Sequence, residues 1–280
     1  MSTPLRRYRA LFAAIVLATG LVVIPAAPAQ AAAAPTLPLF VRRSSDGVLL
    51  VYEPKSGGGV QPAVNLGGGF AAATALLRAN TSASGAGNDL YFRMGNDLYY
   101  TAERGTSTVR AVTNVSGFNL IMTPGNMGST ASPEILARDA AGALWLFPGR
   151  SDGLLGTRVQ AGTAGWNGMN ALAGYGDYTG DGKNDLLART TAGTLYIYPG
   201  TGSITANQIL GTRISAGTGF SAYTALVSTG DNNGDGKADL IARDSAGALW
   251  LFKGTGVATA PFSAAQKIGT SGWNAFNAFF

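Results

Sequence analysis

The sequence contains no cysteine and no histidine. The lack of cysteine excludes disulfides, thiolate nucleophiles and cysteine-based zinc sites. The lack of histidine excludes a Ser-His-Asp triad and imidazole metal ligands. Charged residues make up only 12% of the chain, whereas 46% of it is hydrophobic. This composition is too apolar for a disordered chain, and its hydrophobic residues are too scattered for a helical membrane protein.

Residues 1–31 have the pattern of a secretory signal peptide. An arginine-rich segment (6–9) precedes an apolar stretch (11–24), and Ala29-Gln30-Ala31 offers a small-x-small cleavage site. The apolar stretch is short for a membrane-spanning helix, so a retained anchor is the less favoured alternative. Arg6-Arg7 permits twin-arginine export, but the following residues fit a general secretory signal better. We therefore predict a secreted protein with no membrane segment after signal cleavage.

The mature chain is nearly neutral. Cleavage after Ala31 removes three arginines and no acidic residue, so the net charge falls from +5 to +2. Such a charge gives no support for nucleic acid or an anionic membrane as a partner. We expect a short linker over residues 32–37 and a single domain over residues 38–280, folded as a monomer.

A short segment that ends in arginine recurs five times along the chain. The copies start near residues 38, 89, 134, 185 and 239, at spacings of 45 to 54 residues. Their arginines are Arg42, Arg93, Arg138, Arg189 and Arg243. A period of about 50 residues built from short β-rich runs is typical of a propeller blade with four strands.

The same short runs follow each arginine. A turn with glycine leads to a β-rich run, then a weaker outer strand, then a Gly-aromatic pair that opens the next strand. The β-rich runs are Leu49–Tyr52, Leu98–Tyr100, Leu144–Phe147, Leu195–Tyr198 and Leu249–Phe252. Outer strands are expected at Thr157–Gln160 and Thr212–Ser215. No long segment after the signal peptide has a helical apolar period, so we predict an all-β chain.

The two ends of the repeat complement each other. The chain begins with the second strand of a blade near Pro38 and ends with a first strand, Asn274–Phe280. Pairing of this C-terminal strand with the N-terminal blade would remove an open sheet edge. We therefore predict a β-propeller of five four-stranded blades, closed by that pairing.

Two loops, 177–185 and 231–239, combine oxygen-bearing side chains with glycine in the pattern of a calcium site. Oxygens stand at loop positions 1, 3, 5 and 9, and glycine stands at positions 4 and 6. Calcium takes about six to eight oxygens, and the carbonyl of position 7 can supply one of them. The predicted ligands are Asp177, Thr179, Asp181, Lys183 and Asp185 in the first loop and Asp231, Asn233, Asp235, Lys237 and Asp239 in the second.

The alternative for both loops is a polar turn without metal. The corresponding segments 126–134 and 81–89 have lost most of the pattern. We therefore predict calcium at two blade junctions and not at five.

The segment 223–243, with its D-x-N-G-D-G-x-x-D core, resembles the FG-GAP or VCBS repeat of integrin-α-like propellers and secreted bacterial proteins. That resemblance implies a calcium-binding propeller and covers nearly the whole mature chain, most strongly from Glu134 onward. The phrase Ile-Gly-Thr-Ser-Gly-Trp at 268–273 is similar to the repeat of the five-bladed tachylectins, lectins that bind N-acetylglucosamine-type sugars. This second resemblance is short, and it implies a carbohydrate ligand.

The repeated arginines and aromatics have two interpretations each. The arginines can face a ligand, but we favour hydrogen bonds to carbonyls or carboxylates of the same or the neighbouring blade. Aromatics at equivalent positions (Trp145, Tyr196 and Trp250; Trp166 and Trp273) are expected to pack between blades, with sugar stacking as the alternative.

No nucleophile, base or pair of acids stands out once the two loops are set aside, so we do not expect an enzyme. The favoured function is a secreted, calcium-stabilised module that binds a glycan or cell-surface polymer. The alternative is an adhesion or scaffold propeller that binds proteins, and a secreted hydrolase is the least favoured.

Overall fold

The computed structural model describes residues 34–82, 89–103, 105 and 107–280. The predicted signal peptide, residues 1–31, therefore lies outside the described residues. The described chain forms five four-stranded antiparallel sheets, as the repeat predicts. None of the helices in the described part of the chain is long and apolar enough to cross a membrane.

Each sheet is one blade, and its first strand is the innermost. Blade 1 consists of β20 (Phe276–Phe279), β1 (Leu39–Arg43), β2 (Leu49–Tyr52) and β3 (Val64–Gly67). Blade 2 consists of β4 (Ala75–Ala79), β5 (Asp89–Met94), β6 (Asp97–Ala102) and β7 (Ser107–Val112). Blade 3 consists of β8 (Phe118–Gly125), β9 (Ser132–Asp139), β10 (Leu144–Gly149) and β11 (Val159–Gly162). Blade 4 consists of β12 (Met169–Gly176), β13 (Asp185–Thr190), β14 (Leu195–Tyr198) and β15 (Ile214–Gly217). Blade 5 consists of β16 (Tyr223–Val227), β17 (Leu240–Asp244), β18 (Leu249–Phe252) and β19 (Gln266–Gly269).

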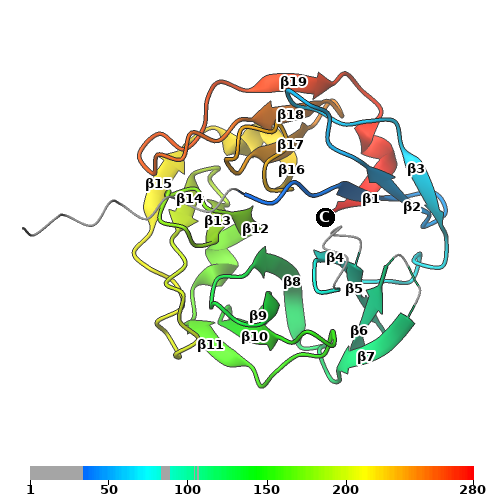
Figure 1. The fold of residues 1–280 in the computed structure, drawn as a ribbon, viewed down its shortest axis with the longest axis vertical. Coiled ribbons are helices and arrows are strands. Elements are labelled where there is room, and N and C mark those ends of the chain that lie inside the picture. The colour runs from blue at the N-terminus through cyan, green and yellow to red at the C-terminus, as the bar shows by residue number, and fades with distance from the viewer. Residues whose placement is uncertain (1–33, 83–88, 104, 106) are drawn as a thin grey trace, which may run out of the picture.

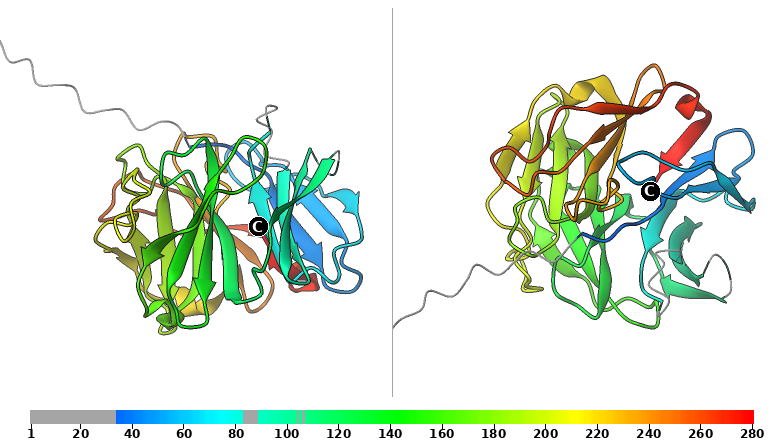
Figure 2. Two further views of the ribbon diagram at one scale, coloured as in Figure 1. Left: turned by 90° about the horizontal axis from the view of Figure 1, so that it is seen from below. Right: turned by 45° about the horizontal axis from the view of Figure 1, so that its top comes forward.

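The blades stand around a central axis, with the C terminus close to it (Figure 1). Seen from the side and tilted, the strands of each blade run between the two faces of the ring (Figure 2). The loops that join first to second strands therefore lie on one face, which we call the loop face. The short turns that lead into each first strand lie on the opposite face.

The outer strands begin later than expected. They start at Val159 and Ile214, two residues after the predicted Thr157 and Thr212. The facing third strand of each blade carries or precedes a proline, Pro148 or Pro199. Proline has no amide hydrogen to donate, so the ladder does not extend to the earlier residues.

Buried apolar side chains hold neighbouring blades together. One cluster joins Leu136 and Leu146 of blade 3 to Leu186 of blade 4, and all three are fully buried. Because both faces of each inner strand meet a neighbouring blade, these strands have continuous apolar runs instead of an alternating pattern. Trp273 packs in a cluster of blade 1 and blade 5 side chains, as expected for an aromatic between blades.

The C-terminal strand closes the ring as the sequence predicts. β20 pairs antiparallel with β1, and Val41 lies opposite Phe279. The backbone groups of Phe40 and Phe280 exchange two hydrogen bonds, and their rings stack with centroids 5.6 Å apart.

Residues 34–37, expected to be part of a linker, pack on the ring. Leu37 is buried and donates its amide to the carbonyl of Thr229, and Thr36 forms a β-bridge with Gly230. This part of the expected linker therefore belongs to the folded domain.

The five repeated arginines fasten each blade to the next. The Nη1 group of Arg138 donates to the carbonyls of Trp166 and Met169, at the start of blade 4, at 2.9 and 2.7 Å. Its Nε donates to Asn119 in the first strand of its own blade. The other four arginines make the same set of bonds. This confirms the structural interpretation of the arginines.

Arg138→Met is expected to lower the free energy of unfolding by about 2–3 kcal/mol, because two carbonyls lose a charged hydrogen-bond donor. Urea unfolding measures the change. Arg150→Met is the matched control, because Arg150 pairs with Asp152 in solvent, with side chains 56% and 46% exposed. Exposed pairs contribute about 0–1 kcal/mol. Equal losses in the two variants would argue against the fastening role.

Candidate functional site

The first predicted loop, between β12 and β13, gathers three carboxylates. One oxygen each of Asp177, Asp181 and Asp185 lies within 4.8 Å of the other two. Gly180 and Gly182 have φ angles of 80° and 85°, a left-handed conformation that side chains disfavour. These two glycines let the loop turn sharply enough to bring its alternate residues together.

Backbone hydrogen bonds shape this loop around its first and last carboxylates. Asp177 accepts the amides of Gly180, Asp181 and Gly182. Asp185 accepts the amides of Tyr178 and Thr179 on one oxygen and that of Gly200 on the other. The Thr179 hydroxyl donates to Asp177 at 3.4 Å, so it lies beside the acidic cluster.

The negative charge of the cluster is poorly compensated. Burial of Asp185, with the nearby charges of Asp177 and Asp181, raises the pKa of its carboxyl to about 7. The ammonium of Lys183 lies 3.4 Å from Asp181, but both side chains are substantially exposed. A hard divalent cation suits a set of carboxylate and hydroxyl oxygens of this kind.

In a chelator that removes any bound metal, the free energy of unfolding of the protein is expected to fall as the pH rises from about 5 to about 8. Burial raises the pKa of Asp185 to about 7 and that of Asp239 to about 6. The unfolded chain has ordinary values near 4, so the folded state binds more protons within this window. Melting temperature in chelator at the two pH values measures the effect, and Asp185→Asn should reduce the difference. A melting temperature that rises with pH in chelator would contradict the prediction.

The second loop, between β16 and β17, has the same backbone scaffold but not the same cluster. Asp231 accepts the amides at positions 4, 5 and 6, and Asp239 accepts those of Asn232, Asn233 and Gly254. Among the described residues, the grouping of three carboxylates found in the first loop has no counterpart here. The amide nitrogen of Asn233 donates to Asp235, which turns a donor toward that carboxylate.

Other parts of the protein hold the second loop in place. The amide of Gly59 donates to the Asn232 side chain, and the amide of Ala34 donates to the carbonyl of Gly236. The geometry of this loop therefore depends partly on segments far away in the sequence.

A buried carboxylate at the last loop position also recurs in blades without the calcium pattern. Asp89 and Glu134 are fully buried and accept backbone amides, as Asp185 and Asp239 do. Burial raises the pKa of Glu134. The last carboxylate of each loop thus has a structural role, whether or not it also binds a metal.

A small pocket between blades 1 and 2 interrupts the five-fold pattern. In four blades the aromatic that precedes or begins the first strand packs on an aromatic of the third strand. These pairs are Tyr52–Trp273, Phe118–Phe147, Trp166–Tyr198 and Phe220–Phe252. In blade 2 the third-strand position is Thr101, and a pocket of about 130 Å³ lies against it.

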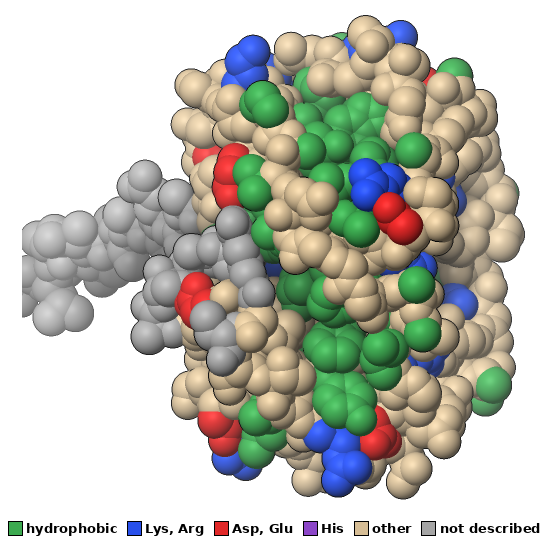
Figure 3. All heavy atoms as spheres, turned by 90° about the vertical axis from the view of Figure 1, so that its right-hand side faces the viewer, with side chains coloured by type: hydrophobic (Ala, Val, Ile, Leu, Met, Phe, Trp, Pro, Cys, Tyr) green, Lys and Arg blue, Asp and Glu red, His purple; other side chains and the backbone are tan. Residues whose placement is uncertain are grey.

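Half-buried aromatic rings and hydroxyls line this pocket. Phe70 and Phe92 contact each other edge to face at 5.4 Å, and Phe92 stacks on Tyr99. The Thr108 hydroxyl donates to that of Thr101. Hydrophobic side chains are exposed on this side of the ring, over blades 1 and 2 (Figure 3).

Two of the aromatics that sequence analysis singled out, Trp145 and Trp250, form hydrogen bonds and cation–π contacts. The indole nitrogens of Trp145 and Trp250 donate to Asp139 and Asp244 of their own blades. The Arg158 guanidinium lies 4.7 Å from the Trp145 ring, and Lys267 lies 4.8 Å from the Trp250 ring. These two tryptophans are therefore held within their blades by hydrogen bonds and cations, which the packing expectation did not include.

Residues 177–242 match the family model of the FG-GAP-like repeat. This part of the chain is similar to an FG-GAP-like repeat. It begins at the first aspartate of the acidic cluster and includes both predicted loops, within the five-bladed ring.

Two solved structures match most of this chain at low sequence identity. A chain of a nidogen/laminin complex is 11% identical with a TM-score of 0.41, and the alignment covers 88% of this chain and 84% of that one. The Dos1 propeller is 11% identical with a TM-score of 0.37, and the alignment covers 84% of this chain and 56% of that one. No curated protein matches the chain.

The pocket at Thr101 lies outside the FG-GAP-like repeat, and sequence reasoning missed it. The available signal was the β-rich run in blade 2, which was predicted to end at Tyr100. In the other four blades the corresponding run continues to an aromatic residue.

Proposed function

We propose that the protein is a secreted β-propeller, stabilised by calcium, that binds a glycan or cell-surface polymer. The observation that carries the binding role is the pocket at Thr101, where an aromatic side chain is replaced and two aromatic rings line the space. Apolar ring faces and hydroxyls together suit the C–H face and the polar edge of a sugar.

The first loop would hold calcium through Asp177, Thr179, Asp181 and Asp185 and the carbonyl of Lys183. Three clustered carboxylates in an FG-GAP-like repeat support this site. The second loop would hold calcium through Asp231, Asn233, Asp235 and Asp239 and the carbonyl of Lys237. The shared backbone scaffold supports the second site, which requires a rotation of the Asn233 amide.

The proposed role of the ion is structural. Each loop joins the first two strands of a blade on the loop face, so an ion there ties these strands together. The buried carboxylates accept backbone amides instead of lining the pocket between blades 1 and 2, which supports a binding protein and not a catalyst.

The size of the pocket favours recognition of one substituent of a sugar. A cavity of about 150 Å³ accepts a benzene-sized group, so about 130 Å³ is too small for an oligosaccharide. The rest of the glycan would lie across the exposed hydrophobic side chains around the opening (Figure 3).

A glycan array and a cell-wall pull-down with calcium test the proposal. Thr101→Phe restores the aromatic of the other blades, so it should fill the pocket and abolish binding while the fold is retained. Val257→Thr is the control, because Val257 is 53% exposed and lies on blade 5. Blank results for the wild type, or equal binding by Thr101→Phe, would overturn the glycan assignment.

A protein ligand is the second candidate. The exposed hydrophobic side chains over blades 1 and 2 favour it. A protein partner captured from the cell surface by the wild type and by Thr101→Phe alike would support this candidate over the glycan.

A further inference from the structure

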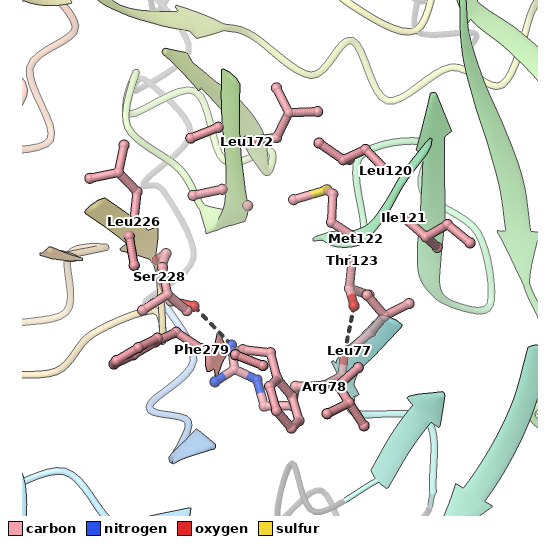
Figure 4. Close-up of a pocket in the computed structure, with 18 of the residues that line it drawn as sticks. Leu77, Arg78, Leu120, Ile121, Met122, Thr123, Leu172, Leu226, Ser228 and Phe279 are labelled. Atoms are coloured by element: carbon pink, nitrogen blue, oxygen red, sulfur yellow. Dashed lines mark hydrogen bonds between the residues drawn. The ribbon is translucent and has the colours of Figure 1, made fainter. Parts of the chain in front are cut away.

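The centre of the ring contains a channel of about 500 Å³ that no predicted site uses. The first strands of all five blades line it (Figure 4). Its walls combine polar groups with apolar side chains, among them Leu120, Met122, Leu172, Leu226 and Phe279. The channel therefore offers apolar surface along part of its length.

The two ends of the channel differ. On the face opposite the loop face, its lining includes the exposed side chains of Asn170, Thr224 and Asn277. Arg243 also lines the channel, but its guanidinium already donates to Thr224 and to two backbone carbonyls. Near the loop face, its lining includes Arg78, which is only 2% exposed. One end is thus polar and solvent-exposed, and the other is closed by a buried cation.

Arg78 of blade 2 contacts every other blade. Its guanidinium donates to the carbonyl of Ser228 in blade 5 (Figure 4) and to that of Pro38 in blade 1. Its own carbonyl accepts the hydroxyls of Thr123 and Tyr175, in blades 3 and 4. The Tyr175 ring also lies 4.6 Å below the guanidinium.

The charge of Arg78 has no opposite charge beside it. Among the described residues, no carboxylate forms an ion pair with it, and its Nε–H is buried without an acceptor. A guanidinium has five N–H donors, and the two bonds to carbonyls use two of them. Burial lowers the pKa of Arg78 to about 10, so the group stays protonated at neutral pH.

We propose that the channel binds a carboxylate that carries an apolar chain, with the carboxylate directed toward Arg78. A buried cation without a counter-ion is costly, and an anion that reaches it gains charge-assisted hydrogen bonds in a medium of low dielectric constant. The leucine and methionine walls bury the chain, and the exposed end of the channel admits it. This site is separate from the calcium loops and from the pocket at Thr101.

Titration calorimetry with dodecanoate, below its micelle concentration, tests the proposal on the folded mature chain. We expect saturable 1:1 binding, and at least about tenfold weaker binding of the neutral analogue dodecanol. Arg78→Met should reduce the affinity for dodecanoate to that for dodecanol, whereas Arg78→Lys should keep the preference for the acid. Val257→Thr, a substitution at an exposed position of blade 5, should leave dodecanoate binding unchanged.

Leu172→Trp provides a test that leaves Arg78 intact. Leu172 is half-buried in the channel wall, so an indole there should obstruct the channel and reduce the binding of both ligands at least tenfold. If Arg78→Met does not fold, Leu172→Trp and the comparison of dodecanoate with dodecanol on the wild type still test the proposal. Equal binding of acid and alcohol, full binding by Leu172→Trp, or no saturable binding would each overturn the proposal.

Discussion

Deletion of Asn274–Phe280 is expected to make the protein aggregate. The deletion removes β20 and leaves β1 as an unpaired inner strand. It also removes the Phe276 carbonyl bonded to Arg243 and the ring of Phe280 stacked on Phe40. An exposed apolar edge strand invites pairing with other chains. Size-exclusion chromatography with light scattering, together with urea unfolding, measures the outcome.

A circular permutant is the matched control for the deletion. β20 ends beside the start of β1, so a short Gly/Ser linker from Phe280 to Pro35 makes blade 1 continuous. With new termini after Gly269, in the turn that follows β19, all twenty strands are retained. This permutant should stay monomeric and unfold cooperatively. A truncated chain that is also monomeric and cooperative would show that β20 is dispensable.

Chelation of calcium should lower the melting temperature of the wild type by about 5–10 °C for each occupied site. An ion at a hundredfold excess over its Kd contributes about 2.7 kcal/mol to the folded state, and in a domain of this size 1 kcal/mol corresponds to about 2–4 °C. Asp181→Ala should remove the contribution of the first loop and Asp235→Ala that of the second. Differential scanning fluorimetry with calcium and with chelator measures both.

Asp181 and Asp235 suit this test because both are exposed, so their replacement removes no buried contact. The double variant should respond little to chelator, whereas Asp152→Ala, which removes an exposed carboxylate of blade 3, should respond as the wild type does. An unchanged melting temperature on chelation would contradict a structural ion. Loss of ligand binding without loss of stability would instead place the ion in direct contact with the ligand.

The regular features of the fold could be predicted from the sequence, and the irregular ones could not. The arginine-ended segments predict the blades because each copy meets the same surroundings, and the matched ends predict closure. The acidic cluster at Asp177 follows from spacing, because alternate residues of a tight loop converge. The same spacing in the second loop does not determine which way the Asn233 amide turns.

Features that occur once need the assembled ring to be understood. The other blades have different residues at the position of Arg78, so a comparison of the repeats gives no reason to single it out. Its significance arises only because five first strands converge and place Pro38, Thr123, Tyr175 and Ser228 around it. Thr101 is likewise visible only when the missing aromatic ring leaves a space between blades.

The hydrogen bonds of the five arginines between blades affect where unfolding of the ring begins. In an open array of repeats the terminal units fray first, because each has a neighbour on one side only. Here Arg243 of blade 5 bonds to the C-terminal segment, which belongs to blade 1. Arg42 of blade 1 in turn bonds to blade 2. The blade that contains both chain ends is therefore anchored on both sides, and slow amide exchange should extend evenly around the ring with no blade that unravels ahead of the others.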